Sequence, residues 1–323
     1  MQNTTSYNKR LNINELNNTA NLKEAIKNAE HLYISNLLGD EELLSSINSY
    51  LKKYNKKLWL SLNKSTEMNQ ENLKQLRYLT NLKKLKIIVF NGFIEDLSEL
   101  SHIDDLEEFT IYDNVKKGIS LVPLAKFKNL SSLSLYTGLT IKQYAVLNTF
   151  EKLEHLSARE IDFSKLNNLP IKELTVDSKF IHSDLIAEKF PDIEYISLQN
   201  CKDVNIENIA SLPQLSDVRL RYMPHITRLT SFKNKENIFH LECVHLKNLE
   251  SIEALFELKQ LKYLMITDLE KLKAEDFYRL KELPNLKVAY ITFKNAKEND
   301  KFITFANAHN WIYKQPSLAK TTL

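Results

Sequence analysis

Ten segments of the chain repeat one apolar pattern, in which the first, fourth and sixth residues are apolar. The alternation at the end of the pattern predicts a half-buried strand, because successive side chains of a strand point to opposite faces. The segments mostly lie about 22 to 25 residues apart, a period that indicates a solenoid of stacked repeats. They begin at Leu82, Leu106, Leu130, Leu153, Ile171, Ile193, Leu215, Ile238, Leu261 and Leu286.

Two earlier segments, residues 31–35 and 57–62, alternate in the same way but lack the leading apolar residue. They bring the expected number of strands to twelve, and residues 311–313 would add a short thirteenth. Because every repeat presents its strand in the same direction, we expect one parallel sheet with strands spaced by about 4.8 Å.

The segments between the strands predict two kinds of return. Asp40 is placed to cap a helix whose apolar residues follow the 3.6-residue period, and Leu73, Leu76 and Leu79 form a second helical stripe. Residues 140–150, 183–189 and 274–283 also predict helices. Residues 96–100 and 119–124 are shorter and predict 3₁₀ turns.

The pattern L-x-x-L-x-L is the signature of the leucine-rich repeat, and residues 119–135 and 246–266 resemble the bacterial internalin type. Over the first 80 residues the longer returns depart from that type. The position that this family fills with Asn or Cys is Asn114 in one repeat and Cys201 in another. The resemblance implies an α/β solenoid, a leucine-rich repeat horseshoe. It would have about twelve parallel strands on the concave face and mixed helical and 3₁₀ returns on the convex face. It specifies the fold and leaves the function open.

We expect three regions along the chain. Residues 1–28 would form an N-terminal tail and a capping helix over residues 22–29, and residues 29–294 would form the solenoid. Residues 295–323 would form the C-terminal cap and tail, with residues 301–306 and Trp311 covering the last repeat. Residues 1–10 and 315–323 are expected to be frayed ends.

Composition excludes several classes of protein. The 44 basic and 41 acidic residues are interleaved and give a net charge of +3, which argues against a nucleic-acid footprint. The chain has no apolar run of 18 residues and no secretory signal, so we expect a cytoplasmic protein that binds no membrane, with secretion by a signal-less route left open. The Asn and Lys excess suggests a bacterial source. The two cysteines lie too far apart for a zinc motif or a disulfide framework.

The strand positions between the buried ones would face outward on the concave side, where they could meet a partner. Trp, Tyr and Arg dominate binding hot spots, although Tyr and Thr also suit any sheet surface. A charged group on neighbouring strands could be an internal ion-pair lattice or a recognition patch, and its members are Arg159, Asp177, Asp217, Arg219, Arg221 and Glu242. The candidate partner-binding residues are Trp59, Tyr112, Tyr136, Arg159, Tyr195, Arg219, Arg221 and Tyr263. We expect their N-terminal and central aromatics, Trp59, Tyr112, Tyr136 and Tyr195, to be solvent-exposed.

The sequence offers one catalytic motif, and it is weak. Cys201 and Asp203 form a C-x-D that resembles the catalytic motif of bacterial ubiquitin ligases carrying leucine-rich repeats, but those enzymes hold it in a separate helical domain. Cys201 also occupies the Asn/Cys position of its own repeat, and Cys243 is expected in the core. The eight histidines show no metal-binding spacing, and the 4 glycines form no phosphate loop. We therefore predict no catalytic residue, no metal site and no cofactor.

The leading hypothesis is a monomeric, non-enzymatic module that binds a partner protein through its concave face, as a toxin neutraliser or an adaptor. One alternative is the substrate-recognition part of a secreted effector or of a ubiquitin-ligase-like protein. A weaker alternative is a binder of nucleic acid or of another anionic ligand through Lys84, Lys86, Arg159, Arg219 and Arg221.

Overall fold

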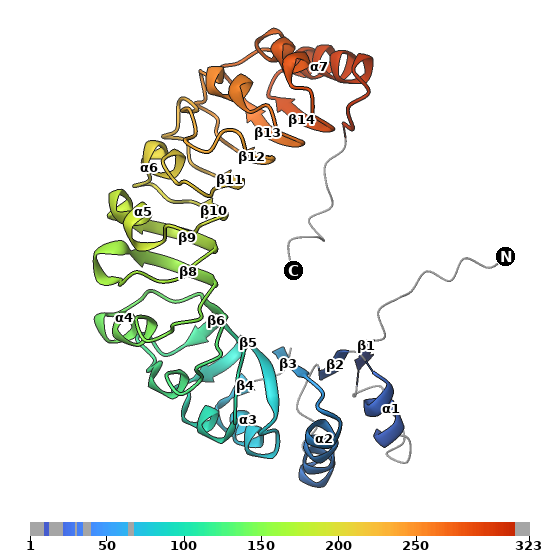
Figure 1. The fold of residues 1–323 in the computed structure, drawn as a ribbon, viewed down its shortest axis with the longest axis vertical. Coiled ribbons are helices and arrows are strands. Elements are labelled where there is room, and N and C mark those ends of the chain that lie inside the picture. The colour runs from blue at the N-terminus through green and yellow to red at the C-terminus, as the bar shows by residue number, and fades with distance from the viewer. Residues whose placement is uncertain (1–9, 13–21, 30, 35–39, 64–67, 314–323) are drawn as a thin grey trace, which may run out of the picture. The chain divides into compact units, whose positions relative to one another are not determined.

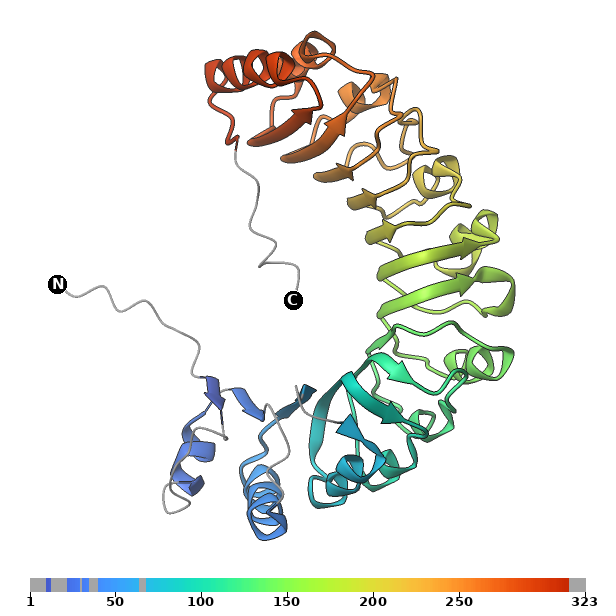
Figure 2. The same cartoon turned by 180° about the vertical axis from the view of Figure 1, so that it is seen from behind.

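The computed structural model describes residues 10–12, 22–29, 31–34, 40–63 and 68–313. The chain divides into two compact units, Met1–Ala158 (unit 1) and Arg159–Leu323 (unit 2). Within each unit the strands line one side and the helices and 3₁₀ turns line the other (Figures 1 and 2). Each unit is therefore a two-layer stack of repeats, as the sequence pattern predicts.

The strands of unit 1 pair in parallel and in chain order. They are β1 (Arg10–Asn12), β2 (His31–Ile34), β3 (Leu58–Asn63), β5 (Leu82–Ile94), β6 (Glu108–Val115), β7 (Ser132–Leu135) and the first half of β8 (His155–Asp162). A two-residue strand, β4 (Met68–Asn69), pairs with the far end of β5. The sequence analysis missed β1 and β4, because strands of three and two residues are too short to show alternation.

The strands of unit 2 also pair in parallel. The first residue of each strand pairs with the first residue of the next, from Glu173 to Val288. They are β9 (Glu173–Ile181), β10 (Tyr195–Gln199), β11 (Asp217–Arg221), β12 (His240–Val244), β13 (Tyr263–Leu269) and β14 (Val288–Phe293). All twelve predicted strands are present. The predicted thirteenth reduces to a single bridge between Val288 and Ile312.

The returns of unit 1 begin where the sequence places their caps. The side chain of Asp40 accepts a hydrogen bond of 2.9 Å from the Leu43 N–H, and Thr140 with Gln143 forms a capping box. The stripe of Leu73, Leu76 and Leu79 is buried, but only its first turn is α-helical. The returns are α1 (Leu22–Asn28), α2 (Glu41–Tyr54), α3 (Gln70–Leu73), η3 (Lys74–Tyr78), η4 (Ser98–His102), η5 (Val122–Leu124) and α4 (Ile141–Leu147).

The returns of unit 2 differ from the sequence prediction in two places. Residues 183–189, predicted as a helix, begin with the 3₁₀ turn of residues 183–185 and are α-helical only over residues 186–189. Residues 274–283, predicted as a helix, contain a 3₁₀ helix whose buried residues Ala274, Phe277 and Leu280 recur at every third position. The last helix covers the final repeat with Phe302 and Ala306, both fully buried. The returns are η6 (Phe163–Lys165), η7 (Ser183–Leu185), α5 (Ile186–Lys189), α6 (Ile206–Ala210), η8 (Glu253–Glu257), η9 (Ala274–Glu282) and α7 (Ala296–Ala308).

Burial fixes the strand register. All three apolar positions of all ten repeats, from Leu82 to Ile291, are buried. The strand residues between them are mostly half-buried or exposed, as in β7 and β11. In each unit these alternate residues cover the sheet on the side away from the returns, and we call this surface the strand face. The class predicted from the sequence, an α/β solenoid with mixed helical and 3₁₀ returns, is confirmed.

Four repeats of unit 2 turn at the same corner after the strand. Asn200, Tyr222, His245 and Asp268 have φ between 54° and 61°, a left-handed conformation that is uncommon without glycine. Their N–H groups donate to the next repeat: that of Asn200 to the Arg221 carbonyl at 3.0 Å and that of Asp268 to Thr292 Oγ1 at 3.1 Å. The residues that follow each corner turn inward and are buried, namely Cys201, Met223, Leu246 and Leu269.

Candidate functional site

The aromatic residues of the strand faces are less exposed than the sequence predicts. We expected Trp59, Tyr112, Tyr136 and Tyr195 to be solvent-exposed, and each is half-buried. The alternation does place them outward, but side chains on neighbouring strands lie against their rings. This cross-strand contact is a property of the register and cannot be derived from one strand alone.

On unit 1, Trp59 and Lys84 lie on paired strands. The Lys84 ammonium is 4.4 Å from the centroid of the Trp59 ring, within the range of a cation–π contact. The same ammonium is 2.6 Å from Glu108 Oε2 on the next strand. Lys84 thus joins an aromatic ring and a carboxylate across three strands.

A second cross-strand contact on unit 1 joins two tyrosines. The rings of Tyr112 and Tyr136 stack with their centroids 3.9 Å apart and an interplanar angle of 21°. The ammonium of Lys86 is 5.5 Å from the Tyr112 ring. Each tyrosine therefore has one ring face covered by the other tyrosine.

On unit 2, an arginine joins an aromatic ring to a carboxylate. Arg219 donates two hydrogen bonds to Asp217, from Nε to Oδ1 and from Nη2 to Oδ2, both of 3.1 Å. Its guanidinium also lies 4.9 Å from the centroid of the Tyr195 ring. Burial raises the pKa of Asp217, and the hydrogen bonds from Arg219 oppose that change.

His240 connects this pair to the next strand. Its Nδ1 is 3.3 Å from Asp217 Oδ2, and its ring lies 4.2 Å from the Tyr263 ring. Burial, together with the positive charge of Arg219, lowers the pKa of His240 to about 4. The ring is thus neutral at pH 7. Nε2 is buried and has no hydrogen-bond partner among the described residues.

A second ion pair completes the group. Arg221 Nε donates to Glu242 Oε1 at 2.7 Å, and Glu242 is only 7% exposed although it occupies an outward strand position. Burial and the negative charge of Glu242 raise the pKa of Tyr263 to about 12. We call the group the unit 2 network, and its members are Tyr195, Asp217, Arg219, Arg221, His240, Glu242 and Tyr263.

The structure shows which members of the charged group form ion pairs with each other. Asp217 with Arg219 and Arg221 with Glu242 form internal ion pairs, as in the lattice alternative. Asp177 instead accepts a hydrogen bond of 2.9 Å from Asn200 Nδ2. Arg159 is exposed and joins neither pair among the described residues. The charges of Arg219 and Arg221 are thus matched by acidic side chains on the same face, and Arg219 also lies against the Tyr195 ring.

Three members of the network were not among the predicted binding residues, namely Asp217, His240 and Glu242. Asp217 and His240 both occupy the first position of their strands, so the repeat register brings them side by side. Their proximity could have been predicted from the sequence, because the two residues occupy the same position in consecutive repeats. Each residue taken alone is only a polar residue on a sheet surface.

Both cysteines are structural. The Cys201 thiol is fully buried and donates to the Gln199 carbonyl oxygen at 3.2 Å, and burial raises its pKa to about 11. Burial also raises the pKa of the Cys243 thiol, which is fully buried in the sheet. A catalytic cysteine needs an accessible thiolate, and neither environment provides one. Cys201 is therefore explained by its buried place at the Asn/Cys position of its repeat.

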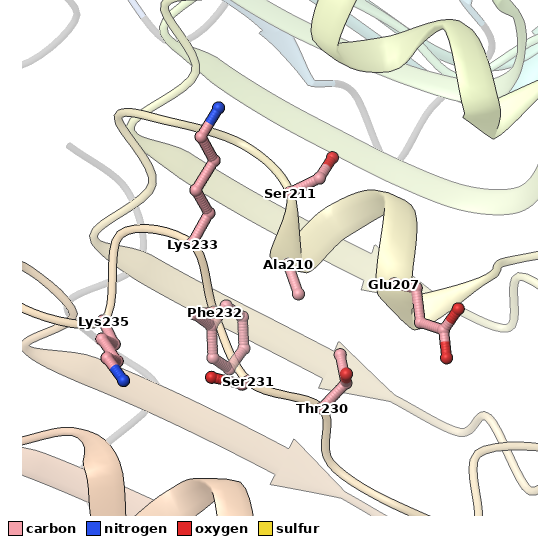
Figure 3. Close-up of a pocket in the computed structure, with 8 residues that line it drawn as sticks. All are labelled: Glu207, Ala210, Ser211, Thr230, Ser231, Phe232, Lys233 and Lys235. Atoms are coloured by element: carbon pink, nitrogen blue, oxygen red, sulfur yellow. The ribbon is translucent and has the colours of Figure 1, made fainter.

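A hollow of about 410 Å³ lies on the return side of unit 2 (Figure 3). It lies between α6 and the segment that carries residues 230–233 and Lys235. Ser231 Oγ and Lys235 Nζ both donate to Glu257 Oε2, at 2.6 and 3.0 Å, so their polar atoms already have partners. Its lining residues are Glu207, Ala210, Ser211, Thr230, Ser231, Phe232, Lys233 and Lys235.

Neither a metal site nor a membrane-spanning helix is present in the part of the chain that the structure describes. No group of three or more His, Cys, Asp or Glu residues there is arranged to hold a metal ion. No helix among the same residues has both the length and the apolar character to span a bilayer.

The stacked strands, the buried L-x-x-L-x-L positions and the mixed returns give the chain the fold of leucine-rich repeat proteins. Solved structures of this class are similar to it. An internalin of Listeria monocytogenes is 17% identical, with 86% of this chain and 79% of that one covered and a TM-score of 0.40. A leucine-rich repeat protein of Leptospira interrogans is 15% identical, with 90% of this chain and 91% of that one covered and a TM-score of 0.37. Internalin C2 of Listeria monocytogenes is 16% identical, with 84% and 92% covered and a TM-score of 0.35. No protein-family model and no curated protein sequence matches the chain.

Proposed function

We propose that the protein binds a partner protein through its strand faces and carries out no chemistry itself. The unit 2 network is the observation that supports this most directly. It holds two tyrosines and two arginines in fixed positions on a sheet surface, and side chains of these types supply most hot-spot energy in protein interfaces. Residues that are already ordered lose little conformational entropy on binding.

The nucleic-acid alternative has less support. Arg219 and Arg221, two of the five basic residues on which it depends, are paired with Asp217 and Glu242. Lys84 is paired with Glu108. Binding to a phosphate backbone needs several unmatched positive charges.

The biological setting that we propose is a monomer in the cytoplasm that acts as a toxin neutraliser or an adaptor. Both cysteines are free thiols, which suits a reducing compartment. The alternative is the substrate-recognition part of a secreted effector or ubiquitin-ligase-like protein. The identity of the captured partner distinguishes them: a toxin for a neutraliser, and a ubiquitinated host protein for a ligase.

Site-specific photo-crosslinking tests the binding proposal. The photoreactive residue p-benzoylphenylalanine replaces Val244, which lies on β12 beside the network, or Lys259, which is exposed on the return side of the same unit. In cells of the source organism, we expect a discrete crosslinked species from position 244 and none from position 259. Tyr195→Ala in the same chain should abolish it, since loss of a hot-spot side chain costs about 2 kcal/mol. A species that forms only from position 259 would place the partner on the return side and refute the proposal.

A further inference from the structure

The strand face of unit 1 carries a continuous row of short hydroxyl side chains with one lysine among them. The register pairs Ser61 with Lys86, Lys86 with Thr110, Thr110 with Ser134, and Ser134 with Ser157. These five residues occupy the same position of β3, β5, β6, β7 and β8, and we call them the hydroxyl row. Ser61, at the β3 end, is only 8% exposed, whereas the other four residues are half-buried and reach the surface. Four inter-strand steps of about 4.8 Å give the row a length of about 19 Å.

Lys86 is the lysine of this face whose charge has no acidic partner among the described residues. The ammonium of Lys57 is 2.7 Å from Glu107 Oε2, and that of Lys84 is 2.6 Å from Glu108 Oε2. The described contact of the Lys86 ammonium is with the Tyr112 ring at 5.5 Å. Lys86 is half-buried, so a carboxylate that reached it would be partly shielded from water, where a charged hydrogen bond is stronger.

The stacked tyrosines stand beside the row. Tyr112 follows Thr110 by two residues on β6, and Tyr136 comes two residues after Ser134, directly beyond β7. Their stack, at 3.9 Å between centroids, gives one side of the row a rigid aromatic wall. The row itself offers hydroxyl groups and one ammonium, and hydroxyl groups can donate to a ligand rich in acceptors.

We infer that the hydroxyl row is the docking surface for an acidic, extended segment of the partner protein, with a carboxylate of that segment on Lys86. This deepens the proposed function and rests on it, because it supplies the chemistry of the partner at the strand face of unit 1. A length of about 19 Å accommodates about six extended residues at 3.3 Å each. The backbone carbonyls of the segment would accept from the row, and its apolar side chains would lie against the tyrosine wall.

Single-stranded nucleic acid, which is also anionic, fits this surface poorly. Bases bind by stacking on open aromatic faces. One face of Tyr112 and one face of Tyr136 are covered by the other tyrosine, and the Lys84 ammonium is 4.4 Å from the centroid of the Trp59 ring. One unmatched ammonium suits a single carboxylate better than a chain of phosphates.

A peptide selection tests the inference without knowledge of the natural partner. Short random peptides displayed on phage are selected on the intact protein and on two charge-reversal variants. Lys86→Glu alters the row, and Lys142→Glu is its matched control, an exposed lysine on α4 of the same unit. We expect Asp and Glu to be enriched on the wild-type protein and on Lys142→Glu, and the enrichment to be lost on Lys86→Glu.

A selected acidic peptide is then titrated by fluorescence anisotropy. Lys86→Met keeps an unbranched aliphatic side chain but removes the charge, and it should weaken binding about tenfold, as expected for loss of one charged hydrogen bond. Unfolding curves of every variant verify that it is folded. Selection of basic or uncharged peptides, or equal effects of Lys86→Glu and Lys142→Glu, would overturn the inference. If position 244 crosslinks a partner while the row shows no acidic preference, the inference fails and the proposed function stands. If a partner crosslinks only from position 259, it binds the return side, and the proposed function fails.

Discussion

Arg219 and Asp217 are two residues apart on one strand, point to the same side of the sheet, and are joined by two hydrogen bonds of 3.1 Å. Their side chains are only 14% and 13% exposed. A paired charge at this depth is stable because its partner replaces water. Removal of either partner leaves a charge with neither water nor a counter-ion.

Arg219→Met should therefore lower the free energy of unfolding by about 3 kcal/mol, because it leaves Asp217 buried and unpaired. The double replacement Asp217→Leu with Arg219→Met should recover most of that loss, because no charge remains. Urea unfolding followed by circular dichroism measures both. Arg228→Met is the control, since the Arg228–Glu207 pair is 67% and 55% exposed and its loss should cost under about 1 kcal/mol. Equal losses for Arg219→Met and Arg228→Met would contradict the burial argument.

His240 should make stability depend on pH in a defined direction. Its folded pKa of about 4 lies below the ordinary value of 6.5, so the unfolded chain binds more protons between these values. Above pH 6.5 the imidazole is neutral in both states and the free energy of unfolding is at its full value. As the pH falls from 6.5 toward 4, the unfolded chain takes up the proton first, and the free energy of unfolding decreases. Between about pH 7 and pH 5 the wild-type protein should lose about 2 kcal/mol more than His240→Asn, in which a neutral amide replaces the titrating imidazole.

The comparison with His240→Asn is needed because Asp217 acts in the opposite sense. Its raised pKa stabilises the fold as the pH falls, since the folded state then binds more protons than the unfolded chain. Urea unfolding at the two pH values measures the difference. If the free energy of unfolding changed equally with pH in the wild-type protein and in His240→Asn, the pKa of His240 would not be lowered by burial in solution.

The thiols should be unreactive in the folded protein. Burial raises the pKa of Cys201 to about 11 and raises that of Cys243 as well, so almost no thiolate is present near neutral pH. Ellman's reagent should label neither cysteine in buffer and both in urea. Cys201→Ala should leave the crosslink from position 244 intact. Rapid labelling of Cys201 in the native protein would reopen the catalytic interpretation of its C-x-D motif.

Leu133 and Ile196 test the repeat register. Both are fully buried at the fourth position of their repeats. Replacement of either by Ala should cost about 2 to 5 kcal/mol, because it leaves a cavity between stacked strands. Ser134→Ala, one residue along on the outward side, should change stability by no more than about 0.5 kcal/mol. Thermal or urea unfolding measures all three, and a small loss at both buried sites would place the strands in another register.

The sequence predicts this fold well because the determining signal is local and repeated. Every L-x-x-L-x-L segment becomes a buried strand, and Asp40 and Thr140 cap the helices that follow them. The kind of return is harder to predict, since residues three apart, such as Phe277 and Leu280, suit both an α-helix and a 3₁₀ helix.

The candidate site is only partly predictable for a different reason. Alternation shows that Tyr195 and Arg219 point outward, but their contact depends on the pairing of two strands 22 residues apart in sequence. The depth of burial depends on side chains from both neighbouring strands. For that reason the ion pairs of Arg219 and Arg221 remained one of two alternatives until the register was known.

Arg219 is paired with Asp217, and Arg221 with Glu242. These ion pairs also determine how a partner would approach unit 2. A matched pair produces a short-range dipolar field, which falls away within the screening length of physiological salt. The network therefore exerts little long-range attraction on an incoming molecule. Association at this face should proceed at the ordinary rate of unsteered protein encounters, about 10⁵ to 10⁷ M⁻¹s⁻¹, and should change little with ionic strength. The lifetime of the complex, rather than the speed of capture, would then distinguish the correct partner from others.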